Sequence, residues 1–376
     1  MADKIKIEQD QSVLGILEQR SDSEGLRIKR FLNMPDLSRT PGSPLAELVE
    51  RTLKVESLKD FDVIEIPEIV STKITFDLFN MPPGHPARSR SDTYYVNDDN
   101  ILRTHDTVMW YYYLNHPNIK KKIKKRESLG VICYGKQYRK DEIDRYHMNV
   151  FHQLGGLYLV PDNKRTVPPE ELKDVLIEIA QGIFGKGVKN RFNIDNFPYT
   201  DPSFEMEIEV KDKWVEMLGS GMPRKTVLSN FGVTGYNGWA FGFGLERLAM
   251  VSMELPDIRL LWSQDERVKK QLKLGNKFKE VSKYPQITRD VSFIVNKNFV
   301  PNNYFDLIRD FGGDLVEQVE LLDKYENAEK FGSDKTSYTY RIIYRSNERT
   351  LTTGEIDPIQ DKIYKETAVQ FGAELR

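Results

Sequence analysis

Arginine, carboxylate and amide side chains crowd one short stretch of this 376-residue sequence, YRKDEIDRYHMNVFHQ at residues 138–153. If the stretch forms two strands joined by a charged turn, alternate residues share a face, and Arg139, Asp141 and Gln153 lie on one surface of a sheet. The planar guanidinium of Arg139 suits a phosphate, and the Asp141 carboxylate can accept a hydrogen bond from a nucleobase or an ammonium group. A half-exposed hairpin with surface ion pairs explains the same residues equally well.

A second candidate for phosphate chemistry is FGFGLER at residues 241–247. It lacks the Lys-Ser/Thr of a P-loop and the glycine spacing of a dinucleotide fingerprint. Taken alone, its glycines let a helix pack closely on a strand, and Arg247 pairs with Glu246 on the helix surface.

The composition predicts a folded protein with a substantial core, because 39% of the residues are hydrophobic and 11% are aromatic. The single cysteine, Cys133, excludes an internal disulfide, and the five histidines show no zinc-type spacing. No apolar run is long enough for a membrane span. The acidic residues among the first 25 argue against an unprocessed mitochondrial presequence. We therefore expect a cytoplasmic protein, or one of the mitochondrial matrix if the chain is a processed form.

Periodicity predicts the elements that hold these residues. Residues 1–40 are polar and are expected to form an irregular N-terminal extension. A helix follows RTPGSP, and PEELKDVLIEIAQGIFG forms another, its inward face made of Leu172, Val175, Leu176, Ile179 and Ile183. Strands are predicted in LGVICYGKQYRKDE, VFHQLGGLYLV, PSFEMEIEV and KWVEMLGSG, and GWAFGFGLERLAMVSM runs from a strand into a helix.

The Lys-rich segment 266–280 is expected to be a linker between residues 41–265 and a smaller domain at residues 281–376. In that domain, RDVSFIV and SYTYRIIYR are strands with helical patterns after each, which predicts an α+β domain.

Three segments in this order resemble the motifs of class II aminoacyl-tRNA synthetases, specifically the single-chain phenylalanyl-tRNA synthetases of the mitochondrial type. They are FDLFNMPPGHPARSRSDTYYV, YRKDEIDRYHMNVFHQL and GWAFGFGLERLAM, and PDIRLLWSQDER continues the third. The segment from KYPQITRDVSFIV to the end is similar to the ferredoxin-like anticodon-binding domain of those enzymes. The resemblance covers residues 41–376. It implies an α+β fold: an antiparallel-sheet catalytic domain followed by the ferredoxin-like domain.

The resemblance implies activation of phenylalanine by ATP and transfer to tRNA(Phe), by a monomer without a membrane partner. Catalysis then rests on alignment and on cations placed where phosphate charge develops. By resemblance, Arg139 holds the α-phosphate, Arg247 holds the far end of the triphosphate, and Asp141 meets the adenine amino group. Mg²⁺ is expected on the phosphates, with Glu205 and Glu216 as candidate ligands.

The amino-acid pocket departs from the family pattern. The family grips the substrate ammonium with an RTHTS-like segment and with the glutamine and glutamate of HQ-x-E, whereas this chain has RTHDT and HQLG. His105 and Gln153 remain, Thr107 replaces the serine, and Gly155 replaces the glutamate. Losing that carboxylate costs on the order of 2 to 5 kcal/mol unless another acid substitutes, and Asp106 is the candidate.

Phe197 and Tyr199 stand where the family presents two phenylalanines edge-on to the substrate ring, and Ala240 keeps a small residue under the para position. Plain core aromatics are the alternative for the first two. Between residues 41 and 376 we expect room only for the catalytic domain and the small α+β domain, and for no editing domain. Two other functions stay open at this stage: a paralogue that activates a different amino acid, and a non-catalytic RNA-binding descendant.

For tRNA the sequence says less. KKKIKKRE at residues 120–127 has six basic residues of eight and either follows the acceptor-stem backbone or is a solvated helix end or loop. Residues 281–376 hold 13 Lys/Arg against 16 Asp/Glu, so tRNA contacts there must be local. Arg341, Arg345 and Arg349 share a face if RIIYRSNER stays extended.

Overall fold

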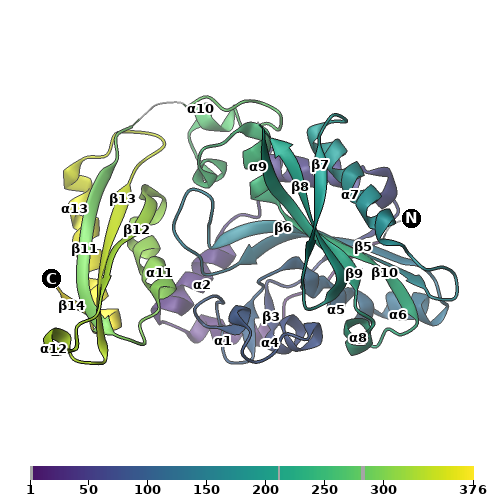
Figure 1. Cartoon of the computed structure of the whole chain (residues 1–376), viewed down its shortest axis with the longest axis horizontal. Helices are drawn as coiled ribbons and strands as arrows, with labels where there is room; N and C mark the ends of the chain where they lie inside the picture. Colours follow the sequence, from purple (N-terminus) through teal and green to yellow (C-terminus); the bar gives the residue numbers. More distant parts are fainter. Residues whose placement is uncertain (1–2, 211, 281–283) are drawn as a thin grey trace. The chain divides into compact units, whose positions relative to one another are not determined.

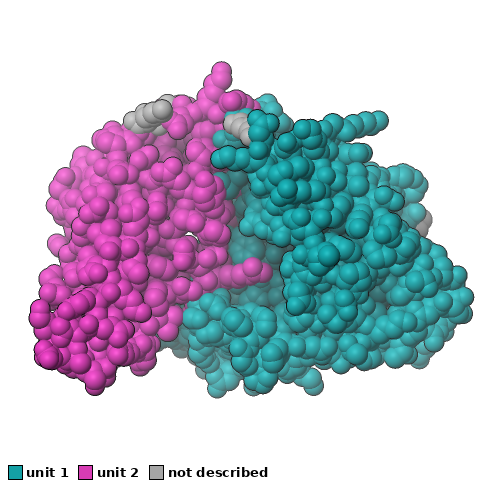
Figure 2. Space-filling view, in the orientation of Figure 1, with its two compact units in different colours: residues 1–138, 150–254, 273–276 teal, residues 139–149, 255–272, 277–376 magenta. Residues whose placement is uncertain are grey.

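The computed structural model describes residues 3–210, 212–280 and 284–376, which form two compact units (Figure 2). Unit 1 comprises residues 1–138, 150–254 and 273–276, and unit 2 comprises residues 139–149, 255–272 and 277–376. Among the described residues, no helix combines the length and apolar character needed to cross a bilayer.

Unit 1 is built on a twisted eight-stranded sheet in the order β1-β2-β5-β6-β10-β9-β8-β7 (Figure 1). The β1–β2 and β2–β5 pairs are parallel and the others are antiparallel. A separate two-stranded sheet joins β3 to β4. The strands are β1 (Lys4–Lys6), β2 (Asp62–Glu65), β3 (Ile69–Ser71), β4 (Asn100–Leu102), β5 (Leu129–Tyr138), β6 (Val150–Pro161), β7 (Asn190–Asp195), β8 (Thr200–Val210), β9 (Lys213–Pro223) and β10 (Tyr236–Gly244).

The helices of unit 1 follow the expected periodicity. α3 begins where the Ser43 hydroxyl accepts from the Leu45 amide, with Pro44 at the first helical position. The inward residues predicted for the long helix α7 are all buried. The helices are α1 (Gln11–Gln19), α2 (Ser23–Asn33), α3 (Pro44–Leu53), α4 (Thr72–Thr75), α5 (Met109–Asn115), α6 (Pro117–Lys124), α7 (Pro169–Phe184), α8 (Lys225–Asn230) and α9 (Leu245–Met253).

The expectation of an irregular segment over residues 1–40 is wrong. It holds β1, α1 and α2, each short helix being N-capped by an aspartate side chain, Asp10 or Asp22. The few apolar residues suffice because they fall on one face: Val13, Leu17, Ile28 and Phe31 are buried.

Unit 2 contains a four-stranded antiparallel sheet in the order β12-β13-β11-β14. Alternate residues of β11 and β13 form one core with residues of α11 and α13, so both helices cover the same face of the sheet. The expected α+β fold class is thereby confirmed for both units. The elements are α10 (Glu266–Lys269), β11 (Ile287–Asn296), α11 (Pro301–Gly312), β12 (Val316–Tyr325), α12 (Ala328–Phe331), β13 (Lys335–Tyr344), α13 (Thr353–Phe371) and β14 (Glu374–Leu375).

Candidate active site on the central sheet

A strip without side chains crosses the middle of the unit 1 sheet. Gly155 on β6 pairs with Gly242 on β10, which pairs with Gly219 on β9. Directly paired residues share a face, so three adjacent strands expose bare backbone there. Cys133 is paired with Gly155 at one end and Glu205 with Gly219 at the other. Burial raises the pKa of the Cys133 thiol to about 12, so this thiol stays neutral.

The Asp106 carboxylate lies on this strip. A Cβ atom added at Gly155 would come within 1.9 Å of Asp106 Oδ2, and one added at Gly242 within 2.9 Å. Asp106 begins the short 3-10 helix η4 (Asp106–Val108), is only 5% exposed, and its amide donates to Gln153 Oε1 at 3.1 Å. The Asp106 carboxylate can therefore occupy this position only because residue 155 is a glycine: any side chain at 155 would take the same space.

Aromatic rings cover the other end of the strip. A Cβ atom added at Gly219 would lie 2.9 Å from Cζ of Phe197. Phe197 stacks on Tyr199 with ring centroids 5.8 Å apart, and the Tyr199 ring meets Phe79 edge-on at 5.7 Å. The His105 ring also meets Phe79 edge-on, at 5.8 Å. A chain of ring contacts thus joins His105 to Phe197 around the glycine strip.

All seven residues expected to hold the amino acid lie in this part of unit 1. His105 Nδ1 is 2.8 Å from Thr107 Oγ1, and both flank Asp106 in sequence. Ala240 is buried on β10, two residues before Gly242 and so on the same face as the strip. The residues gathered in this part of unit 1 are His105, Asp106, Thr107, Gln153, Phe197, Tyr199 and Ala240.

Arg247 is half exposed on α9 and pairs with Glu216 of β9 at 2.6 Å. The alternative, a surface ion pair between Arg247 and Glu246, is wrong. The Glu246 side chain is buried and faces His152. The pKa of Glu205 is raised by burial and by the nearby charges of Glu216 and Glu207, and Arg247 opposes the shift. Two carboxylates and an arginine thus meet at the Glu205 end of the strip.

Mg²⁺ fits a site of this kind, since it usually binds one or two protein carboxylates together with substrate phosphates and waters. The described part of the chain holds no group of three or more acidic, histidine or cysteine side chains arranged for a metal. A cation bound beside Glu205 would oppose the burial and the charges of Glu216 and Glu207 that raise the pKa of this carboxyl.

Arg139 and Asp141 are not on a strand, so their expected place on the sheet face with Gln153 is wrong. Pairing of β5 with β6 ends at Tyr138 and Val150, and the Arg139 amide donates to the Asn149 carbonyl at 3.0 Å. The residues between form an irregular loop that clusters with unit 2. Within that unit, Arg309 donates to the Asp141 carbonyl at 2.7 Å and Asn149 donates to Asp306 at 3.1 Å. Arg139 is exposed.

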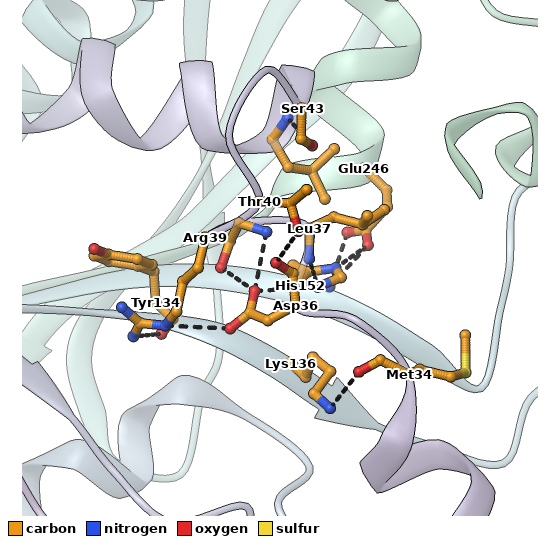
Figure 3. A network of polar contacts seen from close by, with 12 residues as sticks. Met34, Asp36, Leu37, Arg39, Thr40, Ser43, Tyr134, Lys136, His152 and Glu246 are labelled. Atoms are coloured by element: carbon orange, nitrogen blue, oxygen red, sulfur yellow. Dashed lines mark hydrogen bonds and ion pairs between the residues drawn. The ribbon is translucent and has the colours of Figure 1, made fainter. Parts of the chain in front are cut away.

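Sequence reasoning missed the clamp that holds β6 to α9 (Figure 3). The buried carboxylate of Glu246 accepts from the His152 amide at 2.9 Å and lies 2.6 Å from His152 Nδ1. His152 Nε2 accepts from the Leu37 amide at 3.0 Å, so the ring proton is on Nδ1 and points at Glu246. The clamp fixes the residues next in sequence, Gln153 and Arg247. Its signal in the sequence is a histidine and a glutamate each adjacent to a candidate site residue.

The same network ties the segment after α2 to the sheet. Arg39 pairs with Asp36 at 3.2 Å and its guanidinium lies 4.2 Å from the Tyr134 ring centroid, while Lys136 donates to the Met34 carbonyl at 2.9 Å (Figure 3). Residues 34–40 are therefore part of the frame behind the site.

The three arginines proposed for RNA are in ion pairs within unit 2. Arg341 pairs with Asp290 at 2.8 Å, Arg345 with Glu317 at 2.9 Å and Arg349 with Glu355 at 2.7 Å. β13 ends at Tyr344, so the expectation of one continuous extended face is wrong beyond that residue. Of the three pairs, only Arg341–Asp290 joins two strands of the sheet, β13 and β11.

Comparisons with known proteins agree with this geometry. Residues 32–272 match the family model "tRNA synthetases class II core domain (F)", and residues 282–376 match "Ferredoxin-fold anticodon binding domain". The chain is 39% identical over 323 residues to the chloroplastic/mitochondrial phenylalanine–tRNA ligase of Arabidopsis thaliana, covering 83% of this chain and 72% of that protein. It is 37% identical to the mitochondrial phenylalanine–tRNA ligase of Mus musculus, covering 82% and 73%, and 30% identical to that of Saccharomyces cerevisiae, covering 89% and 87%.

Proposed function

This chain belongs to the phenylalanine–tRNA ligases of the class II tRNA synthetases, and from that premise we propose that it activates phenylalanine with ATP and charges tRNA(Phe). In the first step a carboxylate oxygen of phenylalanine attacks the α-phosphorus and pyrophosphate leaves. In the second, a hydroxyl of the terminal ribose attacks the acyl carbon and AMP leaves. Neither step needs a covalent enzyme intermediate, so the protein has to align its substrates and stabilise phosphate charge.

The observation that carries this proposal is the glycine strip with a carboxylate at one end and aromatic rings at the other. A carboxylate suits an ammonium group and the rings suit an apolar aromatic side chain. The missing side chains of the three glycines let Asp106 and Phe197 approach the sheet backbone closely, Asp106 over Gly155 and Gly242 and Phe197 over Gly219. An α-amino acid with an aromatic side chain has those two ends.

In the proposed pocket, Asp106 pairs with the substrate ammonium, and Gln153, His105 and Thr107 complete its hydrogen bonds. Phe197 and Tyr199 pack against the substrate ring, with Ala240 beneath its para position. The placement of Asp106 over Gly155 supports the first assignment, because the carboxylate occupies the space of the side chain that Gly155 lacks.

For ATP we propose that Arg247 and Arg139 grip phosphate oxygens and that Asp141 recognises the adenine amino group. Mg²⁺ held near Glu205 and Glu216 would neutralise charge on the phosphates. The pairing of Arg247 with Glu216 supports its role, since a triphosphate can replace a half-exposed carboxylate partner at little cost.

For RNA we propose that the ferredoxin-like domain contacts the anticodon region, using Arg341, Arg345 and Arg349. RNA phosphates must compete with the exposed carboxylates of Asp290 and Glu355 for Arg341 and Arg349, whereas the partner of Arg345, Glu317, is buried. We expect a monomer, by analogy with the single-chain family. The names of the relatives favour the mitochondrial matrix over the cytoplasm, and tagging the full-length protein in cells tests that location.

Charging of a tRNA(Phe) transcript with labelled phenylalanine tests the function. ATP-dependent, acid-precipitable phenylalanine is expected, and a tRNA with a different identity should stay uncharged. A second candidate is a ligase for another amino acid, which the Asp106–Gly155 arrangement and the hydroxyl of Tyr199 favour. In that case charging succeeds with a different amino acid and fails with phenylalanine.

A further inference from the structure

A cavity of about 660 Å³ lies in unit 1 among α4, α5, α6 and α8, which Figure 1 places in one part of the unit. Three lysines line it: Lys73 of α4 and Lys120 and Lys124 of α6. Its other lining residues are apolar, aromatic, amide or hydroxyl side chains and a glycine, and no aspartate or glutamate is among them. The cavity therefore carries positive charge with no acid to balance it.

The three lysines also lack carboxylate partners elsewhere, as far as the described residues go. By contrast, Lys122, which lies between Lys120 and Lys124 on α6, pairs with Asp62 at 3.1 Å. In another cavity of unit 1 the charges are balanced, because Arg39 pairs with Asp36 and Glu65. Three uncompensated ammonium groups at one cavity repel one another, and a bound anion removes that repulsion.

The positive surface extends beyond the cavity. α6 continues into Lys125 and Arg126, so six of the eight residues 120–127 are basic. The apolar residues that line the cavity include the buried side chain of Phe231. A ligand that satisfies the whole feature is longer than the cavity, carries repeated negative charges and has a flat or apolar part, which describes a nucleic-acid strand better than a single phosphate.

We propose that this lysine cavity, defined by Lys73, Lys120 and Lys124, binds the phosphodiester backbone of RNA, as a contact separate from the anticodon-binding domain. The proposal rests on the proposed function, which brings tRNA to this protein. Each lysine neutralises one phosphate and releases a condensed counterion, so the cavity contributes affinity without reading sequence.

The test measures binding of a fluorescent tRNA(Phe) transcript to the full chain over a range of salt concentrations. The triple variant Lys73→Gln/Lys120→Gln/Lys124→Gln is compared with Lys54→Gln/Lys164→Gln/Lys186→Gln, which removes the same charge from exposed lysines outside the cavity. The binding constant of the cavity variant is expected to depend less steeply on salt: the magnitude of the negative slope of log Kobs against log salt should fall by on the order of 2 to 3. The control variant should change it by less than about 1. Phenylalanine-dependent ATP–pyrophosphate exchange should be unchanged in both.

If the two variants show the same slope of log Kobs against log salt, the proposal is overturned, because the loss of salt dependence then reflects only the change in net charge. A cavity variant that loses binding of inorganic pyrophosphate but keeps the wild-type tRNA slope also overturns it, in favour of a small phosphate ligand. If the wild-type chain exchanges with phenylalanine but binds tRNA(Phe) with no salt dependence, this proposal fails while adenylate formation stands. If it neither exchanges nor charges, the proposed function itself fails.

Discussion

Moving the carboxylate from position 106 to position 155 tests the pocket most sharply. Asp106→Asn keeps the shape of the side chain and removes its charge. Gly155→Glu puts a carboxylate on β6, where the added Cβ would lie 1.9 Å from Asp106 Oδ2. The double variant Asp106→Ala/Gly155→Glu frees that space and restores one carboxylate.

The expected magnitudes follow from burial and overlap. Asp106 is 5% exposed, so losing its pairing with an ammonium costs about 2 to 5 kcal/mol, or about 30-fold to 4,000-fold in kcat/KM for phenylalanine. The KM for ATP should stay close to wild type. Gly155→Glu alone overpacks the strip and places two carboxylates together, which destabilises the fold by about 1 to 3 kcal/mol. The double variant should recover most of the lost kcat/KM for phenylalanine and most of the lost stability.

ATP–pyrophosphate exchange over a range of phenylalanine concentrations gives the kinetic values, and thermal unfolding gives the stability of each variant. The wild type, Asp106→Ala, Gly155→Glu and the double variant form a double-mutant cycle. An unchanged phenylalanine KM in Asp106→Asn would remove Asp106 from the pocket. A double variant no more stable than Gly155→Glu would show that the two residues do not share space.

Three further predictions concern phosphates, pH and fidelity. Arg139→Ala and Arg247→Ala should each lose about 3 kcal/mol or more of transition-state stabilisation in ATP–pyrophosphate exchange without a change in melting temperature, and near-wild-type exchange would contradict the ATP assignment. Because folding raises the pKa of Glu205 through burial and the charge of Glu216, the stability contribution of that carboxyl is present at acid pH and is lost as pH rises through the folded pKa. Glu205→Gln should therefore melt higher than wild type at pH 7 and equally at acid pH, while needing more Mg²⁺ for exchange. Equal melting at both pH values would refute this. An apolar pocket rejects an added hydroxyl by only about a hundredfold, so tyrosine should be activated measurably, more so in Ala240→Gly, and pre-formed tyrosyl-tRNA should persist. Rapid enzyme-dependent deacylation would reveal an editing site.

Local patterns in the sequence were enough to predict most strands and helices, because period-2 and period-3.6 hydrophobicity and capping residues are local properties. The long helix α7 and the β6 position of Gln153 were predicted in this way. The short helices α1 and α2 were missed because few apolar residues suffice for so small a buried face.

Other features depend on partners that the sequence does not reveal. Arg139 lies outside the sheet because β6 begins at Val150, and pairing between strands decides where β5 ends. Glu246 and Arg247 cannot pair, since adjacent helical residues do not face each other; one turns inward to His152 and the other outward to Glu216. The glycine strip forms only through the register of β6, β10 and β9, although the alternating glycines of GFG and GSG were visible in the sequence.

The central claim is that this chain makes phenylalanyl adenylate at the glycine strip, and amino-acid-dependent ATP–pyrophosphate exchange measures that step without tRNA. The wild-type protein, assayed with each of the twenty amino acids, should exchange with phenylalanine far faster than with any other and only weakly with tyrosine. Exchange with a different amino acid in place of phenylalanine, or with none, would contradict the account.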